Sequence, residues 1–184
     1  YLQVISNALK RRSRTHLSDR WTICPTGGLD KVLSFASLFS GNKLNIAVLC
    51  DYGSGDKAKI ERLRQSQILA KGRVLTASDF SGKAESDVED LFNTSLYCEL
   101  VNSAMELTGA LALTPEKIES ANPSTVRVVK QVETYCQTLP PEAPNFGHYV
   151  PAEWLLRNPS VLDGATEQIN QTLDNFERAF QAIN

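Results

Sequence analysis

Two groups of acidic residues in this chain have the residue types and spacing expected of metal ligands. The first is the sequence DYGSGD, which starts at Asp51 and contains two glycines that let a ligand approach the backbone closely. The second lies at 85–90 and holds four carboxylates in six residues: Glu85, Asp87, Glu89 and Asp90. Such crowding is unfavourable unless a cation or a helix N-terminus offsets the repulsion. Because Mg²⁺ binds carboxylate oxygens, both groups are candidate metal sites.

Each group also has a simpler interpretation. Asp51 can accept hydrogen bonds from nearby backbone amides while Ser54 or Asp56 caps the following helix. The acidic segment 85–90 can form a solvated first helical turn with Ser86 as its cap. Both interpretations stay open on the sequence alone.

The apolar pattern predicts the elements that must position these residues. Three short apolar runs predict strands at residues 21–24, 44–50 and 74–76. Three stretches with helical spacing predict helices at residues 1–8, 29–39 and 56–70. The run 44–50 is apolar except for Asn45, which indicates a strand buried on both faces. The alternation predicts an α/β fold with βαβ crossovers and a parallel sheet flanked by helices.

Both acidic groups would then follow strands, at the carboxyl ends where open parallel sheets bind ligands. Two acidic clusters at neighbouring strand ends could hold a pair of ions, which is an arrangement used for phosphodiester cleavage. The sequence therefore favours a site for two Mg²⁺ or Mn²⁺ ions.

After residue 94 the pattern predicts helices only. They are expected at residues 95–107, 114–119, 125–139, 152–157 and 164–183. The last carries a single apolar stripe of Ile169, Leu173, Phe176, Phe180 and Ile183. We therefore predict an α/β domain at 1–94 and a smaller all-helical domain at 95–184.

Composition narrows the class of protein. The chain has 184 residues, 42% of them hydrophobic, and a net charge of -2, which gives no general attraction to nucleic acid. No apolar run approaches the length of a membrane span, so no membrane partner is expected. The four scattered cysteines predict reduced thiols in a cytoplasmic protein rather than a zinc site.

A nucleic-acid surface would have to be a local basic patch. Two basic clusters provide one, and their DNA-binding candidates are Arg11 and Arg12 in the first cluster and Lys57, Arg62 and Arg64 in the second. Solvated helix faces are the alternative, because runs of basic residues commonly serve only that purpose.

Three segments resemble, in order, the C-terminal Toprim (topoisomerase–primase) region of OLD-family nucleases, particularly of class 2. They are CPTGGLDKV, LNIAVLCDYGSGDKAKIERLR and AESDVEDLF. The likeness covers residues 1–92, and the later FGHYVPAEWL and final helix are similar to the family's helical domain. The resemblance implies a Toprim-like fold and a metal-dependent DNA endonuclease or nickase. It also implies an N-terminal ABC-type ATPase in the full protein, which fits a chain that starts at Tyr1 without a Walker motif, and it leaves a homo-oligomer open.

The resemblance also implies roles for particular residues. Asp51 matches the family's aspartate after the central strand, and Asp87, Glu89 and Asp90 match the acids of its later DxEDLF-like segment, so these four are the expected metal ligands. Asp51 and Glu89 are also expected to be catalytic. Lys130 is the expected cation that stabilises the developing charge on the phosphate, with Lys83 as runner-up and an ordinary surface lysine as the alternative.

Two departures from the family pattern favour a competing class. The family's glutamate after the first strand would lie before Tyr1, and its Asp-x-Asp is replaced here by Asp51, Tyr52 and Gly53. A degenerate Toprim-like module that binds DNA or dimerises without cleaving it is therefore the alternative function. The retained acidic segment opposes it, because a surface that only binds DNA gains by losing negative charge.

Overall fold

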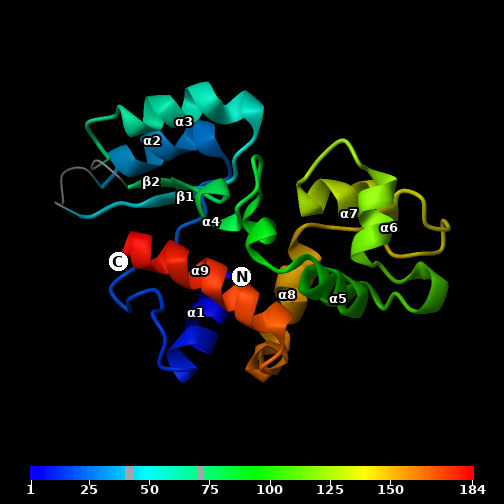
Figure 1. Ribbon diagram of the computed structural model, residues 1–184. Coiled ribbons are helices and arrows are strands. Elements are labelled where there is room, and N and C mark those ends of the chain that lie inside the picture. Colours follow the sequence, from blue (N-terminus) through cyan, green and yellow to red (C-terminus); the bar gives the residue numbers. More distant parts are fainter. Residues whose placement is uncertain (40–43, 70–72) are drawn as a thin grey trace.

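The computed structural model describes residues 1–39, 44–69 and 73–184, and most of them are helical. The α-helices are α1 Leu2–Arg11, α2 Leu29–Ser37, α3 Lys57–Arg64, α4 Ser78–Ser81, α5 Thr94–Met105, α6 Pro115–Ala121, α7 Val128–Cys136, α8 Tyr149–Arg157 and α9 Glu167–Ile183. The strands are β1 Val48–Cys50 and β2 Val74–Thr76, and the 3-10 turns are η2 Ser54–Asp56, η3 Val88–Leu91, η4 Gly109–Leu111 and η5 Pro159–Asp163. The described chain is thus a mixed α/β structure with a small sheet and many helices (Figure 1).

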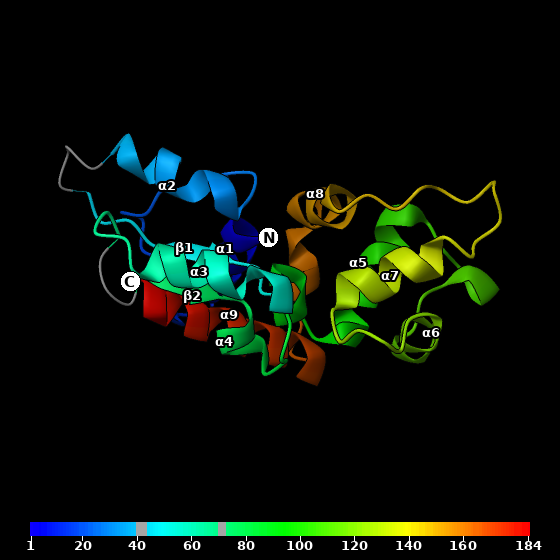
Figure 2. The same cartoon turned by 90° about the horizontal axis from the view of Figure 1, so that it is seen from above.

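The two strands pair in parallel, as the alternation of strands and helices predicts. Val48 lies opposite Val74, and Cys50 lies opposite Thr76. Helices α2 and α3 lie on one side of this sheet, whereas α1 and α9 lie on the other (Figure 1, Figure 2). Because successive strand residues face opposite sides, Val48 packs with the α2–α3 cluster and Leu49 packs with the larger core.

The sheet is smaller than the sequence predicts. Residues 21–24 form no strand, so that prediction is wrong, and Ile23 and Cys24 are exposed. Of the run 44–50 only β1 is paired; its residues are half-buried rather than buried on both faces, and Leu44 is exposed. An apolar run becomes a strand only where a neighbour satisfies its backbone groups, and among the described residues β2 is the one strand beside β1.

All three helices predicted in the first half are present; α1 extends to Arg11, whereas α2 and α3 are shorter than predicted. The helix expected at 29–39 ends at Ser37. The helix expected at 56–70 is α3, which ends at Arg64, and residue 70 lies outside the described part of the chain. The sequence did not predict α4, a single turn directly after β2. The ends of these elements depend on short-range hydrogen bonds that the apolar spacing does not register.

The five helices predicted after residue 94 are all present, and the apolar stripe of α9 is buried along its whole length. This stripe faces α1, whose Ile5 and Leu9 are fully buried in the same core. The ring of Phe92 also meets the ring of Phe176 edge-on, with 5.1 Å between the centroids. The core thus contains residues from both sides of position 94, and the division into domains 1–94 and 95–184 stays a prediction.

A smaller apolar cluster holds the outer layer of the sheet. Its buried members come from α2, α3, β2 and the turn after α3: Val32, Ala36, Ile60, Leu63, Leu69 and Val74. All four cysteines of the chain are thiols without disulfide partners. No helix in the described ranges is both long enough and apolar enough to cross a lipid bilayer.

Candidate functional site

The first acidic turn leaves the sheet at the end of β1. Asp51 follows Cys50 directly, and the chain then enters η2 and α3. The chain after β2 returns to this turn, because Tyr52 and Ser86 form an antiparallel bridge. Each of these two backbone amides donates to the carbonyl oxygen of the other residue, at 2.7 Å and 2.8 Å. The two acidic segments, far apart in the sequence, therefore meet at the carboxyl edge of the sheet.

Side chains add two further connections between the segments. Asp51 Oδ1 accepts a hydrogen bond from the Val88 amide at 2.9 Å, across 37 residues of sequence. Glu85 Oε1 accepts one from the Ser54 amide at 2.8 Å, and hydrogen bonding with the Ser54 side chain and amide lowers the pKa of Glu85. Glu85 and one oxygen of Asp51 thus help to hold the turn in place.

Asp87 and Asp90 are buried and are bound within the chain. Their exposed fractions are only 4% and 3%. They form a reciprocal capping box at η3, in which Asp90 Oδ2 accepts the Asp87 amide at 2.7 Å. Asp90 Oδ1 also accepts the Val128 amide at 2.9 Å and the Lys83 ammonium at 2.5 Å. The cap of this segment is therefore Asp87, where the simpler interpretation placed Ser86.

Arg127 reaches this segment from the start of α7. Its Nε donates to both carboxylate oxygens of Asp87, at 3.1 Å each, and its Nη2 pairs with Oδ1. Its Nη1 lies beside Gly53, 3.5 Å from the position that a Cβ would take there. The guanidinium thus lies between the two acidic segments. Arg127 is not among the residues expected from the sequence, because nothing in the local pattern connects it with Asp87, 40 positions earlier.

Of the four expected metal ligands, Asp51 and Glu89 are the two that no cation of the described chain meets at ion-pair distance, whereas Asp87 and Asp90 are both paired. Burial and the charge of Asp51 raise the pKa of Glu89 to about 7. Desolvation by the surrounding protein also raises the pKa of Asp51, an effect moderated because the residue stays exposed to solvent. Both carboxylates are thus less stable as anions than in water, and a bound cation would reverse this.

Lys130 lies one turn further along α7 and points to other partners. Its ammonium donates to Glu133 Oε2 at 2.8 Å, and the other Glu133 oxygen lies 2.6 Å from His148 Nε2. The charge of His148 lowers the pKa of Glu89, but this effect is smaller than the increase caused by burial. Glu133 is therefore the partner of both His148 and Lys130, the predicted catalytic lysine. The sequence did not indicate either pairing.

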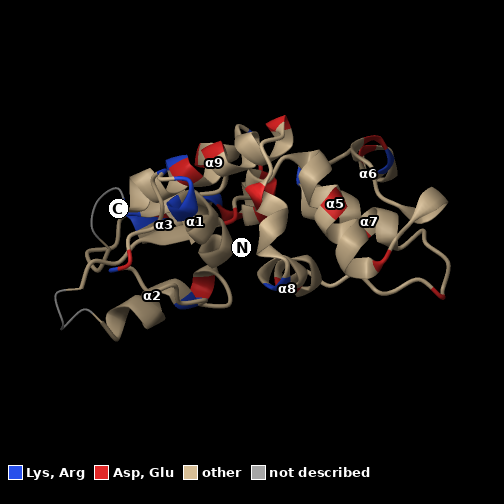
Figure 3. Ribbon diagram, turned by 90° about the horizontal axis from the view of Figure 1, so that it is seen from below, with Lys and Arg blue, Asp and Glu red and all other residues tan. Residues whose placement is uncertain are grey.

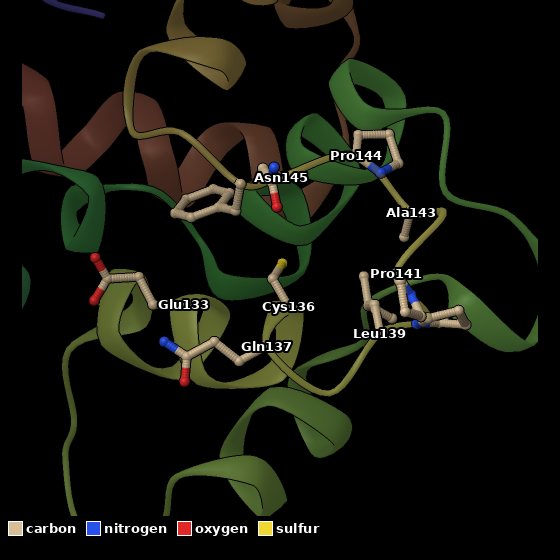
Figure 4. A pocket seen from close by; sticks show the side chains of 10 residues that line it. Glu133, Cys136, Gln137, Leu139, Pro141, Ala143, Pro144 and Asn145 are labelled. Atoms are coloured by element: carbon tan, nitrogen blue, oxygen red, sulfur yellow. The ribbon is translucent and has the colours of Figure 1, made fainter.

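Glu133 also lies at the side of an open pocket of about 440 Å³. Figure 4 shows Cys136, the last residue of α7, and Gln137 after it on one side of the pocket, with Pro141 and Pro144 of the following loop on the other. Burial raises the pKa of the Cys136 thiol to about 11, so this cysteine is not a reactive thiolate at neutral pH. The pocket is next to the Lys130 pair and does not contain the carboxylates of the sheet edge.

The basic candidates fall into two kinds. In Figure 3, Lys and Arg positions gather around α1 and α3. Arg11 forms an ion pair with Asp163 at 2.7 Å, and Arg12 donates to the backbone carbonyls that end η5. By contrast, Lys57 and Arg62 are exposed on α3, directly after the Asp51 turn, and form no ion pair within the described residues; Arg64, also exposed, makes only a long contact of 4.0 Å with Asp79. The second cluster is thus the more available for a nucleic-acid backbone.

Across residues 1–39, 44–69 and 73–184, no group of three or more His, Cys, Asp or Glu side chains is arranged to hold a metal. Asp51 and Glu89 nevertheless offer a pair of carboxylates, and Mg²⁺ is often bound by one or two carboxylates together with water and substrate phosphate. Asp51 and Glu89 are therefore the candidate ligands of one such ion. Comparisons with protein-family models, curated proteins and solved structures found no match to this chain.

Proposed function

We propose that this chain is a Toprim-like catalytic region of a DNA endonuclease or nickase that depends on Mg²⁺ or Mn²⁺. The observation that carries the proposal is the meeting of the Asp51 turn and the segment 85–90 at the carboxyl edge of a parallel sheet, through the bridge between Tyr52 and Ser86. Ligand sites of open parallel sheets form at this edge. The resemblance to OLD-family nucleases rests on the same two segments.

In this proposal Asp51 and Glu89 hold the metal and act in catalysis. A metal ion bound by them would polarise the phosphodiester and lower the pKa of an attacking water. The raised pKa of Glu89 also lets this side chain hold a proton near neutral pH when no cation is present. Asp87 and Asp90 were predicted as ligands as well; their bonds to Arg127 and Lys83 support a positioning role for them first.

Cations of the chain would meet the DNA phosphates. Lys130 remains the proposed cation that offsets charge developing on the scissile phosphate, with Lys83 closer to the carboxylates. Exposed Lys57, Arg62 and Arg64 would neutralise the DNA backbone. An ABC-type ATPase on the same polypeptide, a cytoplasmic location and homo-oligomer formation belong to the proposal through the resemblance alone.

A plasmid-nicking assay tests the proposed activity. The protein should convert supercoiled plasmid to open circles with Mg²⁺ or Mn²⁺ and should stop when EDTA is added. Asp51→Asn and Glu89→Gln should each lower the rate by about 100-fold or more, because each removes a charge that holds the metal. Glu142→Gln is the matched control, because Glu142 is exposed on the proline-rich loop. Nicking by both site variants at the control rate would overturn the assignment.

A second function is supported by a specific observation. Asp87 and Asp90 are fully engaged by Arg127, Lys83 and backbone amides, as in a segment that only stabilises the fold. The chain would then be a Toprim-like module that binds DNA without cleaving it. In that case DNA binding would persist in EDTA at unchanged affinity, and no plasmid would be nicked with any divalent ion.

A further inference from the structure

The two-ion prediction needs oxygens for a second metal, and the obvious donors are engaged elsewhere. Both oxygens of Asp87 accept hydrogen bonds from the Arg127 guanidinium. Both oxygens of Asp90 are also occupied: Oδ1 by Lys83 and the Val128 amide, and Oδ2 by the Asp87 amide. A second ion would have to displace these donors from carboxylates that are almost completely buried.

The guanidinium is held firmly in its position. Arg127 immediately precedes α7, and its own amide donates to Thr125 Oγ1 at 3.2 Å. The next amide, of Val128, is bound to Asp90, which ties the start of α7 to the acidic segment. The Arg127 side chain is only 23% exposed, and charge-assisted bonds to a buried carboxylate are among the strongest hydrogen bonds in proteins.

The guanidinium also faces the first acidic turn. Its Nη1 lies beside Gly53. The hydrogen bond with Asp87 raises the pKa of Arg127 most, and the charges of Asp51 and Glu85 raise it further. One positive group therefore lies against both acidic segments, close to Asp87 in the second and to Gly53 in the first. A planar guanidinium can bind phosphate oxygens as well as carboxylates, whereas a lysine ammonium acts as a point charge.

We infer that Arg127 takes the place of a second metal ion, so that the site binds one divalent cation through Asp51 and Glu89. This inference rests on the proposed function, because it concerns the composition of the same site. Arg127 is then a positioning residue: it neutralises Asp87, and its Nη1 is directed toward the turn where a substrate phosphate would enter. The site would carry its second positive charge permanently, without dependence on the concentration of free metal.

Metal stoichiometry tests the inference without reference to activity. Mn²⁺ is titrated into the protein and free Mn²⁺ is followed by electron paramagnetic resonance, with the wild type, Arg127→Gln and Arg157→Gln. Arg157 is the matched control, because its ion pair with Glu153 is exposed on α8. We expect one bound ion in the wild type and in the control, and two in Arg127→Gln, where Asp87 loses its cation. Glu89→Gln should abolish the single wild-type ion.

The outcomes separate this inference from the proposed function. Two ions in the wild type would overturn the role of Arg127 and leave the nuclease proposal standing. No bound ion in the wild type would overturn the metal-dependent function itself. One ion in both the wild type and a folded Arg127→Gln would also overturn the inference. If Arg127→Gln does not fold, Arg127→Lys replaces it; this variant keeps the charge and should bind one ion, and two ions there would contradict the inference.

Discussion

Two pairs of carboxylates lie at the same edge of the sheet and differ in what meets them. Asp87 and Asp90 are almost fully buried, and each has a cation of the chain against it. Asp51 and Glu89 are more accessible, and in the described chain no lysine, arginine or histidine forms an ion pair with either. The first pair resembles a structural ion-pair network, whereas the second pair has no cation of the described chain against it. Neighbouring residues of one acidic segment can therefore serve different purposes.

Removal of Arg127 tests most directly whether Asp87 belongs to a structural ion pair. Arg127→Gln leaves the buried Asp87 without its charged partner, and we expect the free energy of unfolding to fall by about 3 kcal/mol. Urea unfolding measures this loss. The control Arg157→Gln, from an exposed pair, should lose no more than about 0.5 kcal/mol. Equal losses in the two variants would show that the Asp87 pair contributes no more than a surface pair.

Glu89, which meets no cation among the described residues, should destabilise the fold when it ionises at high pH, whereas the paired Asp87 stabilises it. The pKa of Glu89 is about 7 in the folded protein and 4.5 ordinarily, so the folded state binds the proton more tightly. The stability from this group is complete below about pH 4.5 and is lost as the pH rises through 7. Glu89→Gln removes the cost of ionisation, and its gain in stability should be about 2 kcal/mol larger at pH 8 than at pH 5.

Thermal and urea unfolding in EDTA at the two pH values measure this difference, with Glu142→Gln as the control. A gain that does not depend on pH would mean that Glu89 ionises normally in the folded protein. Under the proposed function, saturating Mg²⁺ should reduce the wild-type loss at pH 8, because the cation stabilises the ionised carboxylate.

The two candidate lysines should also differ in how much their ion pairs contribute to stability, with smaller losses than for Arg127. Lys83 binds a carboxylate that is completely buried, so Lys83→Met should cost about 1–2 kcal/mol of unfolding free energy. Lys130 pairs with the more exposed Glu133, so Lys130→Met should cost less than about 0.5 kcal/mol. Urea unfolding of both variants checks the difference, and a larger loss for Lys130 would contradict it.

How far the sequence predicts this fold depends on the length of each pattern. The stripe of α9 runs over four turns, and every one of its apolar residues is buried. The run at 21–24 is as apolar as a strand, but no strand of the described residues pairs with it, and pairing depends on residues elsewhere in the chain. Strand β2 was predicted over the same residues that form it. Long periodic patterns therefore predicted the presence of their elements, whereas the short apolar runs succeeded at β2 and failed at 21–24.

The candidate site was also predicted only in part from the sequence. The Asp51 turn and the segment 85–90 could be found from the sequence, because each follows an apolar run that ends in polar residues. Arg127 and the pairing of His148 with Glu133 could not, because both depend on where α7 and the following loop lie against the rest of the fold. The local sequence therefore indicated the acidic residues, whereas tertiary packing determined which of them form ion pairs with lysine or arginine.

The smallest expected effect concerns DNA and separates the two basic clusters. Arg62 and Arg64 are exposed on α3, whereas Arg12 is engaged with backbone carbonyls at the end of η5. Each lost phosphate contact should flatten the slope of log affinity against log salt by about 0.9 on duplex DNA. Reversal of Arg62 and Arg64 to Glu should therefore reduce the slope by about 1–2 for every DNA sequence.

The Mn²⁺ stoichiometry of this double variant should be unchanged, because the two arginines would act on the DNA backbone rather than on the ion. Fluorescence anisotropy at several salt concentrations gives the slope, and Arg157→Glu on α8 is the control. Arg12→Glu should instead lower the stability of the fold, because its guanidinium joins α1 to the turn before α9. An unaltered slope for the Arg62 and Arg64 reversal would place the DNA on another surface, such as that of the helices after residue 94, and would separate the acidic site from the exposed face of α3.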